Sequence, residues 1–372
     1  MIIHYSDNAI CPGEPLESSN AHIPGLDGLR GLAVALVFLS HAQLGVPGRF
    51  GPFGVTIFFF LSGFLITTLL QREFDKFGSI SVSDFYKRRF LRIVPPMLIT
   101  ISIVSAISLL RGMTSPSAQA YFIQAFSFTN YYIIFRHYSH GIPNMQPMWS
   151  LSVEEHFYFV YPFVFALMYR KANVKALTLV LGIAAIAVAS FRCWEVWQLR
   201  PYWHDAVAER TIYKVLDIAT HTRIDSIIYG CLFALLANPV RGSRFTKKLN
   251  SIPNAIIGMI LLVAGISAHY IQESIGYVLL GAAFIPLFTV LILQSRTGWL
   301  RFFESPVMLF MGSISYTFYL IHVFVLMSIG SAIHSHVLCA AVSFALSIAY
   351  STAMLWLVER PIAVRRRLIT HG

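Results

Sequence analysis

The sequence predicts an all-α protein that spans the membrane about ten times, with both termini in the cytoplasm. Apolar residues make up 56% of the 372 residues and charged residues only 12%, and the mean hydropathy is +0.65. Apolar runs close to the length that crosses about 30 Å of hydrocarbon recur along the whole chain. A soluble domain of this length is far less apolar, so the composition indicates an integral membrane protein.

Three regions are expected along the chain. The first 20 residues contain no Lys or Arg and no apolar core of a signal peptide, so residues 1–23 are expected to form a cytoplasmic tail. Residues 24–361 form one membrane domain, without a linker or an internal repeat, and residues 362–372 a basic cytoplasmic tail. The ten expected spans are 27–46, 51–71, 94–112, 149–169, 176–194, 223–238, 253–270, 275–294, 306–330 and 337–358.

The net charge of +11 follows from topology and does not indicate a nucleic-acid partner. With the N-terminus inside, most of the 28 basic residues fall in loops and a tail that face the cytoplasm. This distribution obeys the positive-inside rule, and it would attract anionic membrane lipid or an anionic cytoplasmic ligand. The four cysteines are scattered and no pair has metal-ligand spacing, so no metal site is expected.

The first expected span, "GLRGLAVALVFLSHAQL", contains two groups that are costly in a bilayer, Arg30 and His41. Eleven helical positions place both side chains on one face, about 16 Å apart along the axis. Arg30 is near enough to the inner surface to snorkel, whereas His41 lies deeper. A buried His is often only hydrogen-bonded to a neighbour. The shared face favours a function instead, and an imidazole that titrates near neutral pH suits a general base.

A basic segment, "DFYKRRFLRIVPP", leads into the third expected span. Arg89 and Arg92 share one helical face, as do Arg88 and Arg92. The cluster fixes topology by the positive-inside rule. It could also bind an anion, because guanidinium groups match the geometry of phosphate.

Four segments, in this order, resemble acyltransferase family 3: "GLDGLRGLAVALVFLSH", "GVTIFFFLSGFLIT", "FYKRRFLRIVPP" and "MWSLSVEEHFYFVYP". The segments "TRIDSIIYGCLFALL", "GSISYTFYLIHVFV" and "VERP" agree, so the resemblance covers residues 24–361. Members of this family are membrane O-acyltransferases of bacterial surface sugars, lipid-linked glycans and some secreted metabolites. The resemblance implies an enzyme of the bacterial cytoplasmic (inner) membrane that uses acyl-CoA, with acetyl-CoA as the expected co-substrate and no tightly bound cofactor.

The resemblance also implies roles for single residues. The Arg-x10-His signature of the family falls on Arg30 and His41, and its Arg-x-x-Arg signature on Arg89 and Arg92. The three arginines are then expected to hold the donor and His41 to act as the general base. A Gln commonly follows the paired Glu in this family, and His156 stands there in this sequence. Many members carry a further extracytoplasmic hydrolase-like domain. The 372 residues contain none, so a separate polysaccharide-assembly partner or a simple acceptor is expected.

Glu154 and Glu155 are the remaining catalytic candidates. Ser152 and Glu155 have the spacing of a capping box, so Glu155 could merely close a helix end. Glu154 has no such explanation and could orient His41 or contact the acceptor.

Four residues are weaker candidates for lining the site. Trp149 is an interfacial anchor or stacks on a sugar. Asp225 lines the site or forms an ion pair with Arg223. Tyr319 and His322 share roughly one helical face, which more often serves helix packing than catalysis.

The predicted function is transfer of an acyl group, with acetyl expected, from cytoplasmic acyl-CoA to a hydroxyl of a glycan, lipid-linked sugar or exopolysaccharide. The alternative is a proton-coupled transporter without acyl-transfer chemistry, because Arg, His and Glu inside a membrane also mark such carriers. No inverted repeat supports that alternative. A purely structural partner in polysaccharide assembly would leave Arg30 and His41 unexplained.

Overall fold

The computed structural model describes residues 23, 25–45, 50–112, 116–136, 140–169, 173–199, 215–242, 244–271 and 273–367. Within these ranges the chain is helical and has no strand, so the predicted all-α class is confirmed. Most of the predicted N-terminal tail lies outside the described residues, whereas residues 362–367 of the predicted C-terminal tail are helical. The sidedness of the two termini stays a prediction.

Ten main helices follow one another in the described ranges. They are α1 (Leu26–His41), α2 (Phe50–Phe77), α3 (Val82–Leu110), α6 (Trp149–Met168), α7 (Val174–Leu199), α10 (Asp225–Leu236), α12 (Ile252–Ile271), α13 (Glu273–Gln294), α14 (Pro306–Gly330) and α15 (His336–Met354). Short helices connect them: α4 (Ala118–Ala125), α5 (Thr129–Arg136), η1 (Gln146–Met148), α9 (Thr220–Arg223), η3 (Pro239–Arg241), α11 (Arg244–Leu249) and η4 (Gly298–Glu304). The π-helical turn η5 (Leu355–Glu359) continues α15 into α16 (Arg360–Arg367).

Among the described residues, six helices are long and apolar enough to cross a membrane: Phe50–Phe77, Val82–Leu110, Val174–Gln198, Ile275–Gln294, Pro306–Gly330 and His336–Arg365. The other four predicted spans fall on α1, α6, α10 and α12. The shortest is α10, whose 12 residues extend only about 18 Å. It begins two residues after the start of the expected span 223–238 and ends two residues before its end. Ten crossings therefore stay a prediction.

The third long helix begins earlier than its apolar run. Ser81 caps α3, its side chain accepting a hydrogen bond from the backbone N–H of Asp84, and this satisfies one of the free N–H groups of the first turn. The basic segment expected to be a loop is consequently helical. This places Arg89 and Arg92 on the wall of the bundle.

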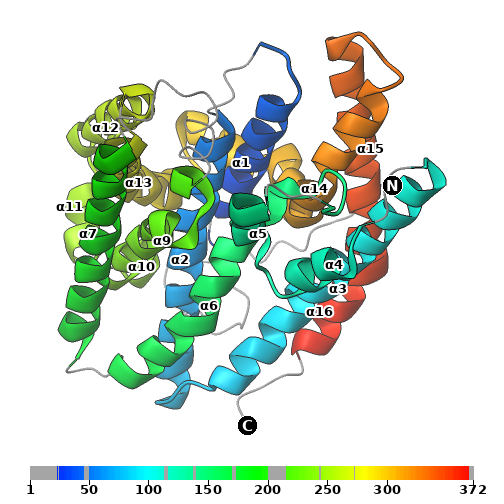
Figure 1. The fold of residues 1–372 in the computed structure, drawn as a ribbon. Coiled ribbons are helices and arrows are strands. Elements are labelled where there is room, and N and C mark those ends of the chain that lie inside the picture. Colours follow the sequence, from blue (N-terminus) through cyan, green and yellow to red (C-terminus); the bar gives the residue numbers. More distant parts are fainter. Residues whose placement is uncertain are drawn as a thin grey trace.

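The middle of the bundle consists of α1, α2, α6 and α14, with α7, α12 and α13 on one side and α3, α15 and α16 on the other (Figure 1). Helix α1 packs against α2 and α14, and α2 packs against α10. Glycine permits the closest of these contacts. A Cβ on Gly63 would lie 1.9 Å from the carbonyl oxygen of Ile227, and one on Gly230 would lie 2.0 Å from that of Phe60. The α2–α10 crossing therefore brings the two backbones together, as small residues do in membrane bundles.

Candidate active site

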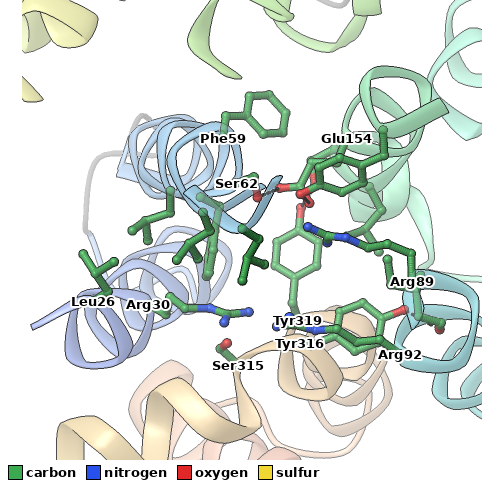
Figure 2. A pocket seen from close by; sticks show the side chains of 18 of the residues that line it. Leu26, Arg30, Phe59, Ser62, Arg89, Arg92, Glu154, Ser315, Tyr316 and Tyr319 are labelled. Atoms are coloured by element: carbon green, nitrogen blue, oxygen red, sulfur yellow. Dashed lines mark hydrogen bonds between the residues drawn. The ribbon is translucent and has the colours of Figure 1, made fainter. Parts of the chain in front are cut away.

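A cavity of about 390 Å³ lies between α1, α2, α3, α6 and α14 (Figure 2). Arg30 reaches it from α1, whereas Arg89 and Arg92 reach it from the opposite wall. The charged and phenolic side chains that line it include Arg30, Arg72, Arg89, Arg92, Glu154, Glu155, Tyr158, Tyr316 and Tyr319. Six of the residues selected from the sequence thus meet in one place.

The cavity is elongated along α2. Its lining on that helix recurs every three or four residues, at Phe58, Ser62, Leu65, Leu69 and Arg72, which is one helical face. Fourteen positions correspond to about 21 Å along the axis. Leu69 is 52% exposed, whereas Tyr319 and Ser150, which line the same cavity, are buried. The cavity is therefore open near the end of α2 and closed toward Tyr319.

The basic run at the start of α3 divides into paired and unpaired groups. Lys87 forms an ion pair with Asp84 at 3.0 Å, and Arg88 forms one with Glu73 at 2.7 Å. Arg89 forms no salt bridge within the described ranges. Lys87 and Arg88 thus have carboxylate partners outside the cavity lining, whereas Arg89 lines the cavity.

Arg89 and Arg30, two of the four arginines in the cavity lining, are candidate anion ligands. The guanidinium of Arg89 lies over the ring of Tyr158, 4.0 Å from the ring centroid, which is a cation–π contact. Arg30 makes no hydrogen bond or ion pair with any residue that the structure describes. Both groups keep their donors available, and a guanidinium fork is suited to phosphate.

Glu154 is held at both carboxylate oxygens. Ser62 donates a hydrogen bond to Oε1 at 3.0 Å, and Tyr158 donates one to Oε2 at 3.3 Å. Arg89 also lies over the ring of Tyr158. The hydrogen bond from Tyr158 to Glu154 therefore fixes the ring against which that guanidinium packs.

Glu155 lines the cavity but does not cap a helix. Helix α6 begins at Trp149, and Ser152 donates its hydroxyl to the carbonyl oxygen of Met148 from inside the helix. The capping box considered for Ser152 and Glu155 is therefore wrong. The paired carboxylates both remain candidates for the chemistry of the cavity.

His41 does not line this cavity but is connected to it. Its Nδ1 lies 2.8 Å from the carbonyl oxygen of Val37 and 3.4 Å from Nε2 of His322. His322 is fully buried and packs against Tyr319, with ring centroids 5.5 Å apart. Tyr319 lines the cavity and donates its hydroxyl to the carbonyl oxygen of Pro147 at 2.8 Å. Tyr319 and His322 thus connect the cavity to His41.

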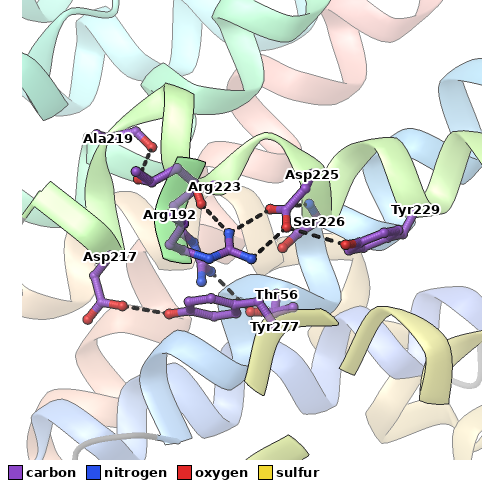
Figure 3. A network of polar contacts seen from close by, with 10 residues as sticks. Thr56, Arg192, Asp217, Ala219, Arg223, Asp225, Ser226, Tyr229 and Tyr277 are labelled. Atoms are coloured by element: carbon purple, nitrogen blue, oxygen red, sulfur yellow. Dashed lines mark hydrogen bonds and ion pairs between the residues drawn. The ribbon is translucent and has the colours of Figure 1, made fainter. Parts of the chain in front are cut away.

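Asp225 belongs to a separate buried network (Figure 3). Its two oxygens accept hydrogen bonds from Arg192 at 3.1 and 2.8 Å, and both side chains are fully buried. Arg223, the partner considered from the sequence, instead lies 3.6 Å from the ring centroid of Tyr277 and donates to the hydroxyl of Thr56 at 3.1 Å. The expected Asp225–Arg223 pair is wrong, and Asp225 is not in the cavity lining.

Trp149 is also outside the cavity lining. It is half-buried at the start of α6, and its ring meets that of Phe59 edge to face, with centroids 6.2 Å apart. Phe59 lines the cavity, so Trp149 supports the wall from behind. Among the residues that the structure describes, no group of three or more His, Cys, Asp or Glu side chains could hold a metal ion.

A family model described as an acyltransferase domain matches residues 23–358. The chain belongs to this acyltransferase family. The peptidoglycan O-acetyltransferase OatA of Listeria monocytogenes is 27% identical over 324 residues, which cover 82% of this chain and 49% of that protein. The O-acetyltransferase OatA of Staphylococcus aureus is 25% identical over 321 residues, which cover 82% and 50%. The chain spans about half the length of these curated relatives, and no solved structure matches it.

The cavity also contains residues that the sequence does not single out. Ser62, Arg72 and Tyr158 line the cavity but are not among the residues that the sequence predicts for the site. The signal for Arg72 was present, because it lies ten positions after Ser62 on the same face of α2. Which helix that face meets depends on tertiary packing, so the spacing alone did not reveal a cavity.

Proposed function

We propose that this acyltransferase moves an acyl group, with acetyl expected, from acyl-CoA to a hydroxyl group of a glycan. The observation that carries the proposal is the elongated cavity, lined by arginines at its open end and connected to a histidine at its closed end. The relatives that the chain resembles are named O-acetyltransferases, which favours an enzyme over the transporter considered from the sequence. The names of the relatives, which include a peptidoglycan O-acetyltransferase, support a cell-envelope glycan as the acceptor class.

Acyl-CoA suits the shape and charge of the cavity. Its phosphates would bind Arg72, Arg89 and Arg92 near the open end, with Arg30 farther in. The apolar face of α2, with Leu65 and Leu69, would hold the flexible pantetheine arm. The thioester would then be directed along α1 toward His41, about 16 Å beyond Arg30.

The chemistry follows from the groups at the two ends. His41 Nε2 would take the proton of the acceptor hydroxyl as the oxygen attacks the thioester carbonyl carbon. The carbon–sulfur bond then breaks, and the protonated imidazole returns that proton to the leaving thiolate. The products are an acylated acceptor and free CoA. Direct transfer is the simplest sequence that uses only these groups.

Replacing Arg89 by Gln is expected to weaken CoA binding. A charge-assisted hydrogen bond contributes about 1.5–3 kcal/mol, so the Kd should rise roughly 10- to 100-fold. The measurement is calorimetric titration of CoA into the protein in lipid nanodiscs. Arg88→Gln is the matched control. It removes the same charge from the neighbouring position, where the arginine is paired with Glu73 and does not line the cavity. Equal affinity of the Arg89 variant and the wild type would contradict the placement of the donor.

A further inference from the structure

We propose that His322 is a positioning residue that holds the proton of His41 on Nδ1 and leaves Nε2 of His41 free as the base. The inference rests on the proposed role of His41 and deepens it. The contact between His41 on α1 and His322 on α14 decides which nitrogen of the His41 ring is free to act as the base.

The proton of His322 is located by its own backbone. Nδ1 of His322 lies 2.8 Å from the carbonyl oxygen of Tyr319, and a carbonyl oxygen only accepts hydrogen bonds, so Nδ1 carries a hydrogen. The ring is fully buried and contacts no carboxylate within the described residues. A lone charge there would be costly, so the imidazole is neutral and Nε2 is an acceptor.

The proton of His41 is located in turn. Its Nδ1 faces two acceptors, the carbonyl oxygen of Val37 at 2.8 Å and Nε2 of His322 at 3.4 Å. The same carbonyl also accepts a hydrogen bond from the hydroxyl of Ser40 at 2.7 Å, so it is shared. With acceptors on both sides, Nδ1 of His41 must carry the hydrogen. The lone pair of the neutral ring is then on Nε2, which makes no hydrogen bond within the described residues.

His322 is held rigidly enough to do this. Its ring stacks on Phe318, with centroids 6.0 Å apart and planes at 10°, and lies 6.4 Å from the ring of Phe38 on α1. These rings restrict rotation of the imidazole. His322 thus acts on His41 as a fixed partner acts on a catalytic imidazole, by setting its tautomer and its orientation.

Two substitutions separate hydrogen bonding from packing. His322→Phe keeps an aromatic ring among Phe38 and Phe318 but removes the acceptor. His322→Gln places a side-chain oxygen near the former Nε2. We expect His322→Phe to lower kcat about 10- to 100-fold, the effect that removing the partner of a ligating imidazole has at metal sites, with the KM for acetyl-CoA unchanged. His322→Gln should recover most of the lost kcat.

The matched control is Phe344→Leu, whose ring contacts Phe38 and Phe318 but makes no polar contact with either histidine. It should lower the unfolding temperature and leave kcat unchanged. The assay follows label from acetyl-CoA into envelope glycan at saturating and limiting donor.

Wild-type kcat in His322→Phe, or equal losses in both His322 variants with normal CoA binding, would overturn the positioning role. If His322→Phe does not fold, the test rests on His322→Gln. The positioning role is then overturned if His322→Gln folds but loses as much kcat as His41→Ala. A failure of the proposed function gives a different pattern, in which His41→Ala is as active as the wild type or no protein transfers label.

Discussion

His41→Ala is expected to lower kcat for acyl transfer by about 10² to 10⁴, the range that a general base contributes. Without the imidazole, the group proposed to take the proton of the acceptor hydroxyl is lost, and the attack on the thioester slows. CoA binding should change little, because the arginines that would hold the donor are elsewhere. The measurement is label transfer from acetyl-CoA to envelope glycan together with calorimetric CoA binding.

The control for that experiment is His334→Ala, which removes an exposed imidazole between α14 and α15. Its transfer rate should equal that of the wild type. A His41→Ala variant that keeps the wild-type rate would retain the enzyme but remove the proposed base. A variant that loses CoA binding along with activity would instead indicate that His41 acts through donor binding.

Asp225→Asn is expected to destabilise the protein more than any other substitution discussed. It leaves the fully buried guanidinium of Arg192 without its carboxylate, and an uncompensated buried charge costs about 3–5 kcal/mol. The network joins α7, α10 and α13 through Arg192, Asp225 and Tyr277, so these helices should separate first. Thermal unfolding in detergent, followed by circular dichroism, measures the effect.

The exposed ion pair between Arg241 and Asp75, at 2.7 Å, provides the matched comparison. Asp75→Asn should change the stability by no more than about 1 kcal/mol, because exposed pairs contribute little. The double variant Arg192→Leu and Asp225→Leu should regain part of the loss, since it removes both charges together. If Asp225→Asn and Asp75→Asn unfold at the same temperature, the network does not hold the helices together.

Much of the fold could be predicted because the bilayer limits the choices. Continuous apolar runs of suitable length can only be helices there, and each expected span coincides with a helix. The first and last residues of the helices are harder to predict from the sequence. The start of α3 is charged, so hydropathy places its beginning near residue 94 although Ser81 caps it much earlier. The break at Ile224 lies between the charged residues Arg223 and Asp225, at the start of the expected span 223–238.

The residues of the cavity were predictable for a physical reason. Charged groups such as Arg30 and Glu154 are costly in hydrocarbon unless they face a cavity or a partner, so their positions mark one. The partners themselves were not predictable, because they depend on how the helices pack. Asp225 lies two positions from Arg223 in sequence, yet its partner is Arg192, which belongs to α7. The contact between His41 and His322 joins α1 to α14 in the same way.

The most direct test of acyl transfer uses membranes that contain the wild-type protein and acetyl-CoA labelled on the acetyl group. Label is followed into lipid-extractable and surface glycan and compared with membranes that contain the His41→Ala variant in equal amount. We expect acid-stable, alkali-labile label in glycan, as for an O-acetyl ester, with wild type alone. Wild-type membranes that consume no donor and label no glycan, while binding CoA normally, would contradict the account and favour a carrier.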